Sequence, residues 1–135
     1  CAQAVGVMQQ LHAQTLDYSK QRKQFGQPIG RFQVLQHRIV DMFLEQEQSR
    51  SMLLMAMLKL DTADDTRKAA ISQAKAKIAK GLKFSGQSAV QTHGGIGITN
   101  ELAIGHYFMR ATMIESQFGD ADHHFDRYER LTLDA

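Results

Sequence analysis

The sequence predicts an all-α protein, an up-and-down four-helix bundle with a short additional C-terminal helix. Apolar residues recur at spacings of three and four over long stretches, which is the period of a helix and not of a strand. Glycine, proline and polar clusters interrupt these stretches at a few places, and the links are short. Short links favour antiparallel neighbours, so we expect one bundle domain over residues 1–135.

The first predicted helix begins with the chain and ends before the only proline, Pro28, which forms a turn together with Gly26 and Gly30. Its apolar stripe consists of Cys1, Val5, Met8, Leu11, Thr15 and Tyr18. No capping residue precedes the stripe and no methionine begins the chain. We therefore interpret the chain as a fragment of a longer protein.

The second helix is expected over residues 33–60, where polar Gln46 and Ser49 interrupt the stripe and could face a partner or a ligand. A polar link over residues 61–66 leads into a third helix that reaches about Thr92. The third helix has a face of small side chains, which would let its neighbours approach closely. These small residues are Ala70, Ala74, Ser85 and Ala89.

A glycine-rich segment, residues 93–97, ends the third helix, because each glycine there costs about 1 kcal/mol relative to alanine. We expect it to be a loop. Thr99 or Asn100 is expected to cap a fourth helix that ends at about Ser116. A short final helix follows Gly119 and reaches about residue 131.

The bulk composition indicates a soluble globular protein, with 43% apolar and 22% charged residues. A formal charge of +2 with scattered basic residues makes a nucleic-acid partner unexpected. No apolar run approaches the length of a membrane span, so we expect no membrane partner either. The single cysteine, Cys1, excludes an internal disulfide and fits a cytoplasmic location.

Two segments between helices carry the functional signal. The first reads Arg-x-x-Phe-Gly and then Pro-Ile-x-x-Phe-Gln over residues 22–33, and the second reads Gln-x-x-Gly-Gly-x-Gly over residues 91–97. Arg22 could clamp a phosphate, Phe25 could stack on a flat ring, and bare glycine backbone could approach a pyrophosphate. Each segment alone could equally be a surface charge, a core aromatic residue or a helix stop. Together they suit a dinucleotide.

The order and spacing of these motifs resemble the C-terminal domain of acyl-CoA dehydrogenases. The resemblance implies that both loops contact the FAD of a neighbouring subunit, within a homotetramer or a heterotetramer. The positions that match the family's FAD contacts are Arg22, Phe25, Ile29, Phe32 and Gln33 in the first loop, and Gln91, His93, Gly94 and Gly95 in the second. His93 is implied to act through its backbone, and His123 matches a position near the adenosine end of its own subunit's FAD.

The resemblance also implies the reaction, which is α,β-dehydrogenation of an acyl-CoA thioester. A carboxylate removes the α-proton and a hydride leaves to the flavin. The electrons would pass to an electron-transfer flavoprotein. A fragment of such an enzyme would not turn over substrate alone.

The expected catalytic glutamate falls at Phe118 or Gly119, and neither can accept a proton. Three alternatives stay open. Asp120 could act as the base, a glutamate could lie upstream of Cys1, or the chain could belong to a non-catalytic subunit of a heteromeric enzyme. A flavin monooxygenase or oxidase on the same scaffold is the competing enzyme class.

A metal site is the remaining alternative for the C-terminal segment. Asp120 and His123 lie three residues apart, as metal ligands in helical bundles do. A di-iron bundle needs a second such pair and two further carboxylates, and Glu45 and Glu47 offer no Glu-x-x-His motif. We therefore expect no metal.

Overall fold

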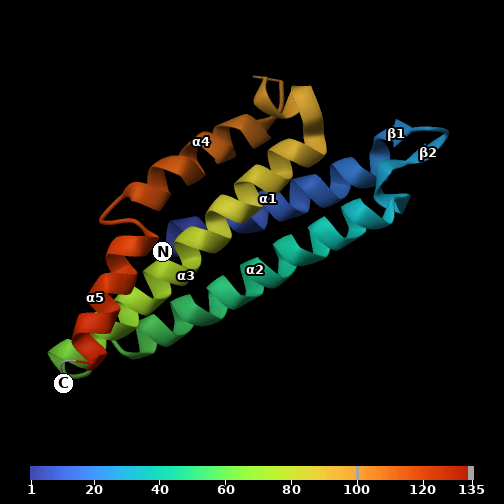
Figure 1. Cartoon of the computed structure of the whole chain (residues 1–135). Coiled ribbons are helices and arrows are strands. Elements are labelled where there is room, and N and C mark those ends of the chain that lie inside the picture. Colours follow the sequence, from blue (N-terminus) through green and yellow to red (C-terminus); the bar gives the residue numbers. More distant parts are fainter. Residues whose placement is uncertain (100, 134–135) are drawn as a thin grey trace.

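The computed structural model describes residues 1–99 and 101–133 and is almost entirely helical (Figure 1). The long elements are α1 (Ala2–Gln21), α2 (Gln33–Leu58), α3 (Asp64–His93), α4 (Ala103–Ser116) and α5 (Ala121–Leu133). The short elements are the strands β1 (Lys23–Gln24) and β2 (Gln27–Pro28) and the 3-10 helices η1 (Ile29–Arg31) and η2 (Gly94–Ile98). Asn100, one of two expected helix caps, lies outside the described residues.

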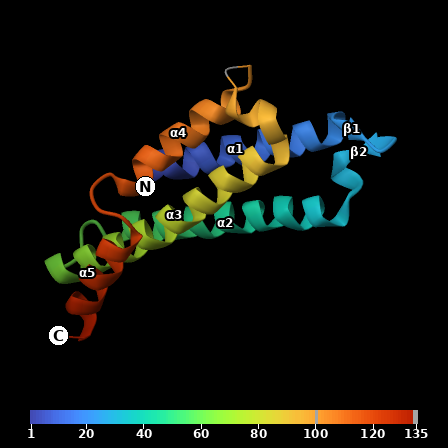
Figure 2. The same ribbon diagram turned by 45° about the horizontal axis from the view of Figure 1, so that its top comes forward.

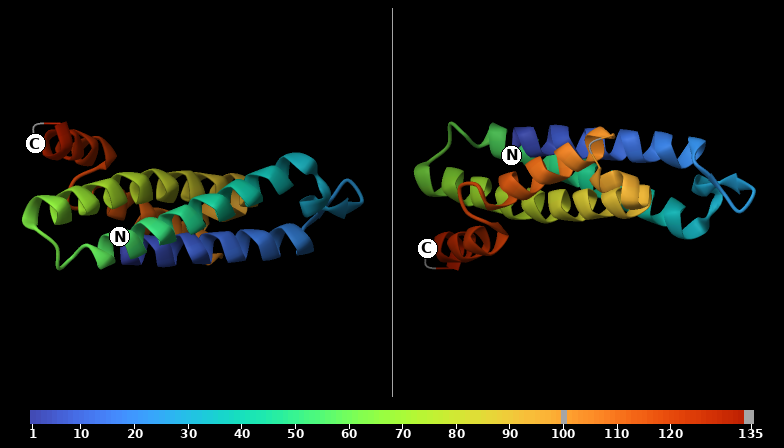
Figure 3. Two further views of the ribbon diagram at one scale, coloured as in Figure 1. Left: turned by 90° about the horizontal axis from the view of Figure 1, so that it is seen from below. Right: turned by 90° about the horizontal axis from the view of Figure 1, so that it is seen from above.

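The helices α1 to α4 alternate in direction, and α5 turns aside to pack against the first half of α3 (Figures 1 and 2). Helix α3 contacts all four other long helices, and in both views of Figure 3 it lies between α5 on one side and α1 on the other. The predicted bundle with an additional terminal helix is confirmed. No helix among the described residues is long and apolar enough to cross a membrane.

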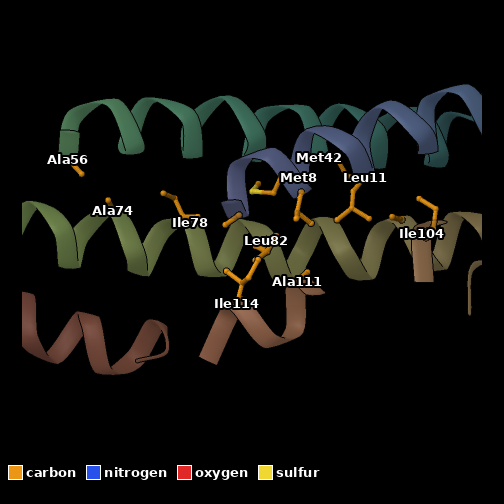
Figure 4. Packing of buried hydrophobic residues seen from close by; sticks show 13 residues of the cluster. Met8, Leu11, Met42, Ala56, Ala74, Ile78, Leu82, Ile104, Ala111 and Ile114 are labelled. Atoms are coloured by element: carbon orange, nitrogen blue, oxygen red, sulfur yellow. The ribbon is translucent and has the colours of Figure 1, made fainter. Parts of the chain in front are cut away.

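The core forms around the small-residue face of α3, and Figure 4 shows side chains of α1, α2 and α4 converging on it. The predicted small residues Ala70, Ala74, Ser85 and Ala89 are all buried, which confirms this face. On α1 the buried face is shifted from the predicted stripe, since Cys1 is exposed. The buried residues of α1 are Ala4, Val7, Met8, Leu11, Thr15 and Ser19.

Ser49, one of the two polar residues that interrupt the α2 stripe, faces α3. Ser49 is fully buried, and a Cβ added to Gly81 of α3 would lie 3.0 Å from Ser49 Oγ and 2.8 Å from Glu45 Oε2. Lys77 of α3 donates to the same Glu45 oxygen at 2.6 Å. Small and polar side chains at this crossing therefore let the two helix backbones approach closely.

Two helix starts differ from the prediction. Helix α3 begins at Asp64, inside the predicted link, because acidic residues in a first turn favour the helix dipole and Asp64 also pairs with Arg67 and Lys68. Helix α4 begins only at Ala103, so the predicted cap at Thr99 is wrong. The Thr99 hydroxyl donates to Ile96 O at 2.9 Å and stays within the preceding turn.

The buried core makes a first prediction about stability. Leu82 of α3 is fully buried, whereas Leu58 at the end of α2 is 82% exposed. Leu82→Ala should lower the free energy of unfolding by about 2–5 kcal/mol, because the lost contacts leave a cavity. Leu58→Ala should stay within about 0.5 kcal/mol in the same denaturant titration of the purified protein. Equal losses in the two variants would contradict this core.

Candidate functional site

A β-hairpin carries the first group of predicted ligand contacts. Strands β1 and β2 pair through a two-residue turn in which Phe25 has a φ of 53° and Gly26 a φ of 78°. Positive φ at both positions is the geometry of a type I′ turn, whose twist matches that of the strands. The strands are too short to leave an alternating pattern, so the sequence predicted a turn without them. Phe25 stands at the tip, 90% exposed.

The base of the hairpin is fixed to the bundle. Ile29 N–H donates to Arg22 O at 2.8 Å, and the Ile29 side chain is buried. Phe32 is half-buried and meets the Phe25 ring edge to face, with centroids 6.1 Å apart. Gln33 opens α2 and is exposed. The predicted contacts Arg22, Phe25 and Gln33 are therefore open to a ligand, while Ile29 anchors the loop.

The second group lies where α3 ends. Gly94 has a φ of 66° and a ψ of −147°, a conformation that is essentially restricted to glycine, and its N–H donates to Val90 O. A Cβ at Gly94 or Gly95 would meet nothing within 4 Å, whereas one at Gly97 would lie 2.9 Å from His93 Cβ. The packing around Gly97 therefore leaves no room for a side chain. The backbone of Gly94 and Gly95 is exposed and has open space around it, and Gln91 one turn earlier is also exposed.

The His93 side chain is occupied within the fold. It is buried, its Nδ1–H donates to Ala89 O at 2.8 Å, and burial lowers the pKa of the imidazole. Its ring also stacks on that of Tyr18, with centroids 4.2 Å apart. The imidazole therefore serves to hold the end of α3 in place.

Tyr18 brings the two loops to the same end of the bundle, and sequence reasoning did not assign it this role. Its hydroxyl lies 3.5 Å from His93 O as a long hydrogen bond, in addition to the ring stacking. Arg22 follows one helical turn later, and its N–H donates to Tyr18 O at 2.8 Å. The hairpin projects beyond the end of α3 in Figure 1. The only sequence signal for this contact was the place of Tyr18 in the first apolar stripe.

Asp120 and His123 lie at the opposite end of α4 and are not brought together with the two loops (Figure 1). The Asp120 carboxylate accepts a hydrogen bond from His123 N–H at 2.9 Å, which caps the start of α5. Both side chains are exposed. Among residues 1–99 and 101–133, no three His, Cys, Asp or Glu side chains gather as a metal site would need.

Two buried polar side chains near Asp120 were missed by sequence reasoning. Lys75 of α3 donates to Ile114 O at 2.7 Å and to Glu115 O at 3.0 Å, and so holds the last turn of α4. His124 of α5 lies between Ser72 and the Phe118 carbonyl. The sequence did not indicate the hydrogen bonds of Lys75 and His124, because the periodic pattern predicts only that both residues lie in helices.

A surface groove near the hairpin does not contain the predicted contacts. It has a volume of about 430 Å³ and lies under the hairpin, between the end of α1 and the start of α2. None of the ten predicted FAD contacts lines it. A smaller groove of about 270 Å³ between α2 and α3 includes Gln91 and Arg38. The candidate site is therefore an open surface of two loops rather than a closed pocket within this chain.

Comparison with known proteins identifies the class. Residues 1–130 match the family model described as acyl-CoA dehydrogenase, C-terminal domain. The chain belongs to the acyl-CoA dehydrogenase family, and the resemblance seen in the two loop motifs is confirmed.

Individual relatives agree with this assignment. The chain is 42% identical over 100 residues to an L-prolyl-[peptidyl-carrier protein] dehydrogenase of Serratia sp.. The aligned region covers 74% of the chain and 26% of the relative. It is 35% identical over 122 residues to a probable acyl-CoA dehydrogenase of Bacillus subtilis, covering 90% and 32%.

Solved structures show the same fold. An FAD complex of PigA superposes with a TM-score of 0.85 at 35% identity, covering 94% of the chain and 33% of that structure. Butyryl-CoA dehydrogenase from Megasphaera elsdenii gives 0.89 at 26% identity, covering 98% and 34%. The chain thus spans about a third or less of the proteins it matches.

The buried histidines predict how stability depends on pH. Burial lowers the pKa of His93 and of His124 below the ordinary value of 6.5. Below pH 6.5 these histidines bind protons more readily in the unfolded chain than in the folded chain. The stability that the neutral imidazoles contribute is therefore present above pH 6.5 and is lost as the pH falls through the folded pKa. The free energy of unfolding should therefore decrease as the pH falls below about 6.5. His93→Asn should reduce this slope in denaturant titrations, and an unchanged slope would contradict the burial of a neutral imidazole.

Proposed function

We propose that the chain is the C-terminal domain of an FAD-dependent acyl-CoA dehydrogenase and that its two loops bind the FAD of a neighbouring subunit. The observation that carries this proposal is the meeting of the two family motifs at one end of the bundle, through Tyr18 and His93. The similarity to an FAD complex of PigA supports the cofactor. The domain assignment over residues 1–135 and the oligomeric state rest on the same resemblance.

The exposed groups fit a dinucleotide. The Arg22 guanidinium is free to pair with phosphate oxygens, and Phe25 offers a ring face at the hairpin tip. The bare backbone of Gly94 and Gly95 is not required by the packing of this chain, so a bound group can approach it without meeting a side chain. Gln33 and Gln91 add exposed amides, and the buried Ile29 keeps the hairpin in place. FAD, when bound, supplies the hydride acceptor of the dehydrogenation.

The substrate is proposed to be an acyl thioester, and an electron-transfer flavoprotein is proposed as the electron acceptor. Acyl-CoA is the expected carrier, but the similarity to a dehydrogenase named for a prolyl carrier protein makes carrier-bound thioesters worth testing. His123 remains the proposed neighbour of the adenosine end of its own subunit's FAD. It is exposed at the start of α5 and is free to make that contact.

The base is proposed to be Asp120 or a residue before Cys1, and the third alternative is that this subunit has no base. Asp120 is exposed but already accepts a hydrogen bond as the cap of α5. Phe118 and Gly119, where the family places a glutamate, carry no proton acceptor. This observation favours a second candidate function, a non-catalytic subunit that completes the flavin site of a partner.

The FAD assignment is tested by removing the guanidinium. Arg22→Ala in the full-length protein should lower the flavin retained per subunit several-fold after purification, because a phosphate loses its charged partner. Arg50→Ala, which removes an exposed guanidinium from α2, is the control and should retain flavin as the wild type does. Full flavin content in Arg22→Ala would contradict the assignment of Arg22 as the main FAD contact.

The base and the reaction are tested by anaerobic bleaching of the flavin. A panel of acyl-CoA and carrier-bound thioesters should include one that bleaches the wild-type flavin. If Asp120 is the base, Asp120→Asn should slow bleaching by at least about a hundredfold, since general base catalysis contributes that much. Asp122→Asn, two residues away and exposed, is the matched control. Normal bleaching in Asp120→Asn would exclude Asp120 as the base and favour a residue before Cys1. If no thioester bleaches the wild-type flavin, the non-catalytic subunit would be favoured.

A further inference from the structure

The hairpin end of the bundle carries more positive charge than a single phosphate contact needs. Residues 18–40 contain five lysine or arginine residues and no aspartate or glutamate. Residues 84–98, which end α3 and form the glycine segment, contain no lysine, arginine, aspartate or glutamate. The two segments that meet through Tyr18 and His93 therefore have a strongly positive local charge, in a chain whose formal charge is only +2.

Arg38 differs from the other cations of this region in its burial. It lies in the second turn of α2 and is half-buried, whereas the other four are exposed, namely Lys20, Arg22, Lys23 and Arg31. None of the ion pairs among the described residues includes Arg38. By comparison, Lys77 is half-buried between the same two helices and pairs with Glu45 at 2.6 Å. A guanidinium that loses water without gaining a carboxylate is suited to an anion from outside the chain.

Arg38 lines a groove of about 270 Å³ between α2 and α3. The other lining residues all belong to α3 and are Phe84, Gln87, Ser88 and Gln91. Their spacings of three, one and three residues place them on one face of the helix. Gln87 and Gln91 are exposed, and Phe84 is 38% exposed. The groove thus offers one cation, two amides and a hydroxyl, and no carboxylate lines it among the described residues.

The groove continues the second FAD loop, because Gln91 belongs to both. Gln91 is a predicted FAD contact, and it lies one turn before the exposed backbone of Gly94 and Gly95. On the opposite wall, Arg38 follows Gln33, another predicted contact, by five residues. A ligand that lies along the two loops therefore reaches the groove without crossing the bundle.

The diphosphate of FAD suits a second guanidinium. Each of its phosphate groups carries a negative charge, and the planar fork of one arginine pairs with one such group. Arg22 at the base of the hairpin supplies one fork. Arg38 supplies another, from α2 instead of the hairpin, and the neighbouring amides can donate to phosphate or ribose oxygens.

We propose that Arg38 is a second cationic contact for the diphosphate of the neighbouring subunit's FAD, and that the groove between α2 and α3 receives this part of the cofactor. The inference rests on the proposed function, since it takes the cofactor from there. Arg38 binds and orients the cofactor, and it has no part in proton or hydride transfer.

The test is titration of the full-length apoprotein with FAD, followed by flavin fluorescence. Arg38→Met keeps an unbranched apolar stem in the groove and removes the guanidinium. It should raise the dissociation constant for FAD about tenfold at low ionic strength, because charge-assisted hydrogen bonds are lost. The difference from the wild type should shrink as salt is added. Arg50→Met removes an exposed guanidinium farther along α2 and should bind FAD as the wild type does.

ADP separates a contact with the diphosphate from a general loss of the site. It shares the diphosphate and adenosine of FAD but has no flavin ring, so it should compete with FAD for the wild-type apoprotein. Arg38→Met should weaken ADP by about the same factor as FAD, again about tenfold. Arg38→Lys keeps the charge without the planar fork, and its affinity should lie between those of Arg38→Met and the wild type.

A charge introduced on the opposite wall of the groove gives a test that does not depend on an Arg38 variant. Gln87 is exposed, so Gln87→Glu leaves the core unchanged and places a carboxylate in the groove. It should weaken FAD about tenfold or more, because the carboxylate repels the diphosphate and attracts Arg38. Gln73→Glu makes the same change at an exposed position near the start of α3 and should bind FAD as the wild type does.

Two outcomes would overturn the inference while leaving the proposed function intact. These are a folded Arg38→Met protein that binds FAD as tightly as the wild type, or one that binds FAD more weakly but ADP equally well. If Arg38→Met does not fold, Arg38→Lys and Gln87→Glu decide, and wild-type affinity in both would overturn the inference. If Arg22→Ala also binds FAD as the wild type does, the proposed binding of FAD by the two loops fails as well.

Discussion

The close approach of the other helices to α3 is the constraint on which the rest of the structure depends. Its buried face is rich in alanine, glycine and serine, and a Cβ at Gly81 or Gly86 would lie within 3.1 Å of a side chain on a neighbouring helix. Because α3 contacts every other long helix, it also positions the glycine segment that follows it and the turn between α4 and α5. Its last residues carry the bare glycine backbone, and its first half holds Ser72 and Lys75 beneath the Phe118 turn.

Buried polar contacts then secure each end against the bundle. Tyr18 and His93 join α1 to the end of α3, while His124 and Ser72 join α5 to its first half. A buried imidazole must find partners for its ring nitrogens, so each histidine restricts the backbone that it contacts. The Phe25-Gly26 turn lies at the tip of the hairpin that follows α1, whereas the Phe118 carbonyl lies 3.0 Å from His124 Nε2, and both phenylalanine rings are exposed. Each of these phenylalanines has a positive φ, which lowers the stability of the folded chain, and each ring is exposed to solvent.

This division of labour agrees with membership in the acyl-CoA dehydrogenase family. The two loops present an exposed guanidinium, an exposed ring and bare glycine backbone, and positions 118 and 119, where the resemblance implies a glutamate, are Phe118 and Gly119. Asp120 directly follows these positions in the sequence, and its carboxylate accepts a hydrogen bond from His123 N–H as the cap of α5.

The sequence by itself indicated the long helices, the approximate places where they end and the family, whereas the predicted loop over residues 93–97 forms the end of α3 and the 3-10 helix η2. A period of 3.6 residues marks helical segments, glycine and proline mark their ends, and the two loop motifs were specific enough to identify the class. The start of α3 was misplaced because Asp64 and Asp65 read as a polar link, although their charges stabilise a first turn. Only the tertiary structure decided that Tyr18 meets His93, 75 positions away, and that His124 holds the Phe118 carbonyl against Ser72. Periodicity records which face of a helix is buried, but the residue that lies opposite is fixed by how the helices pack.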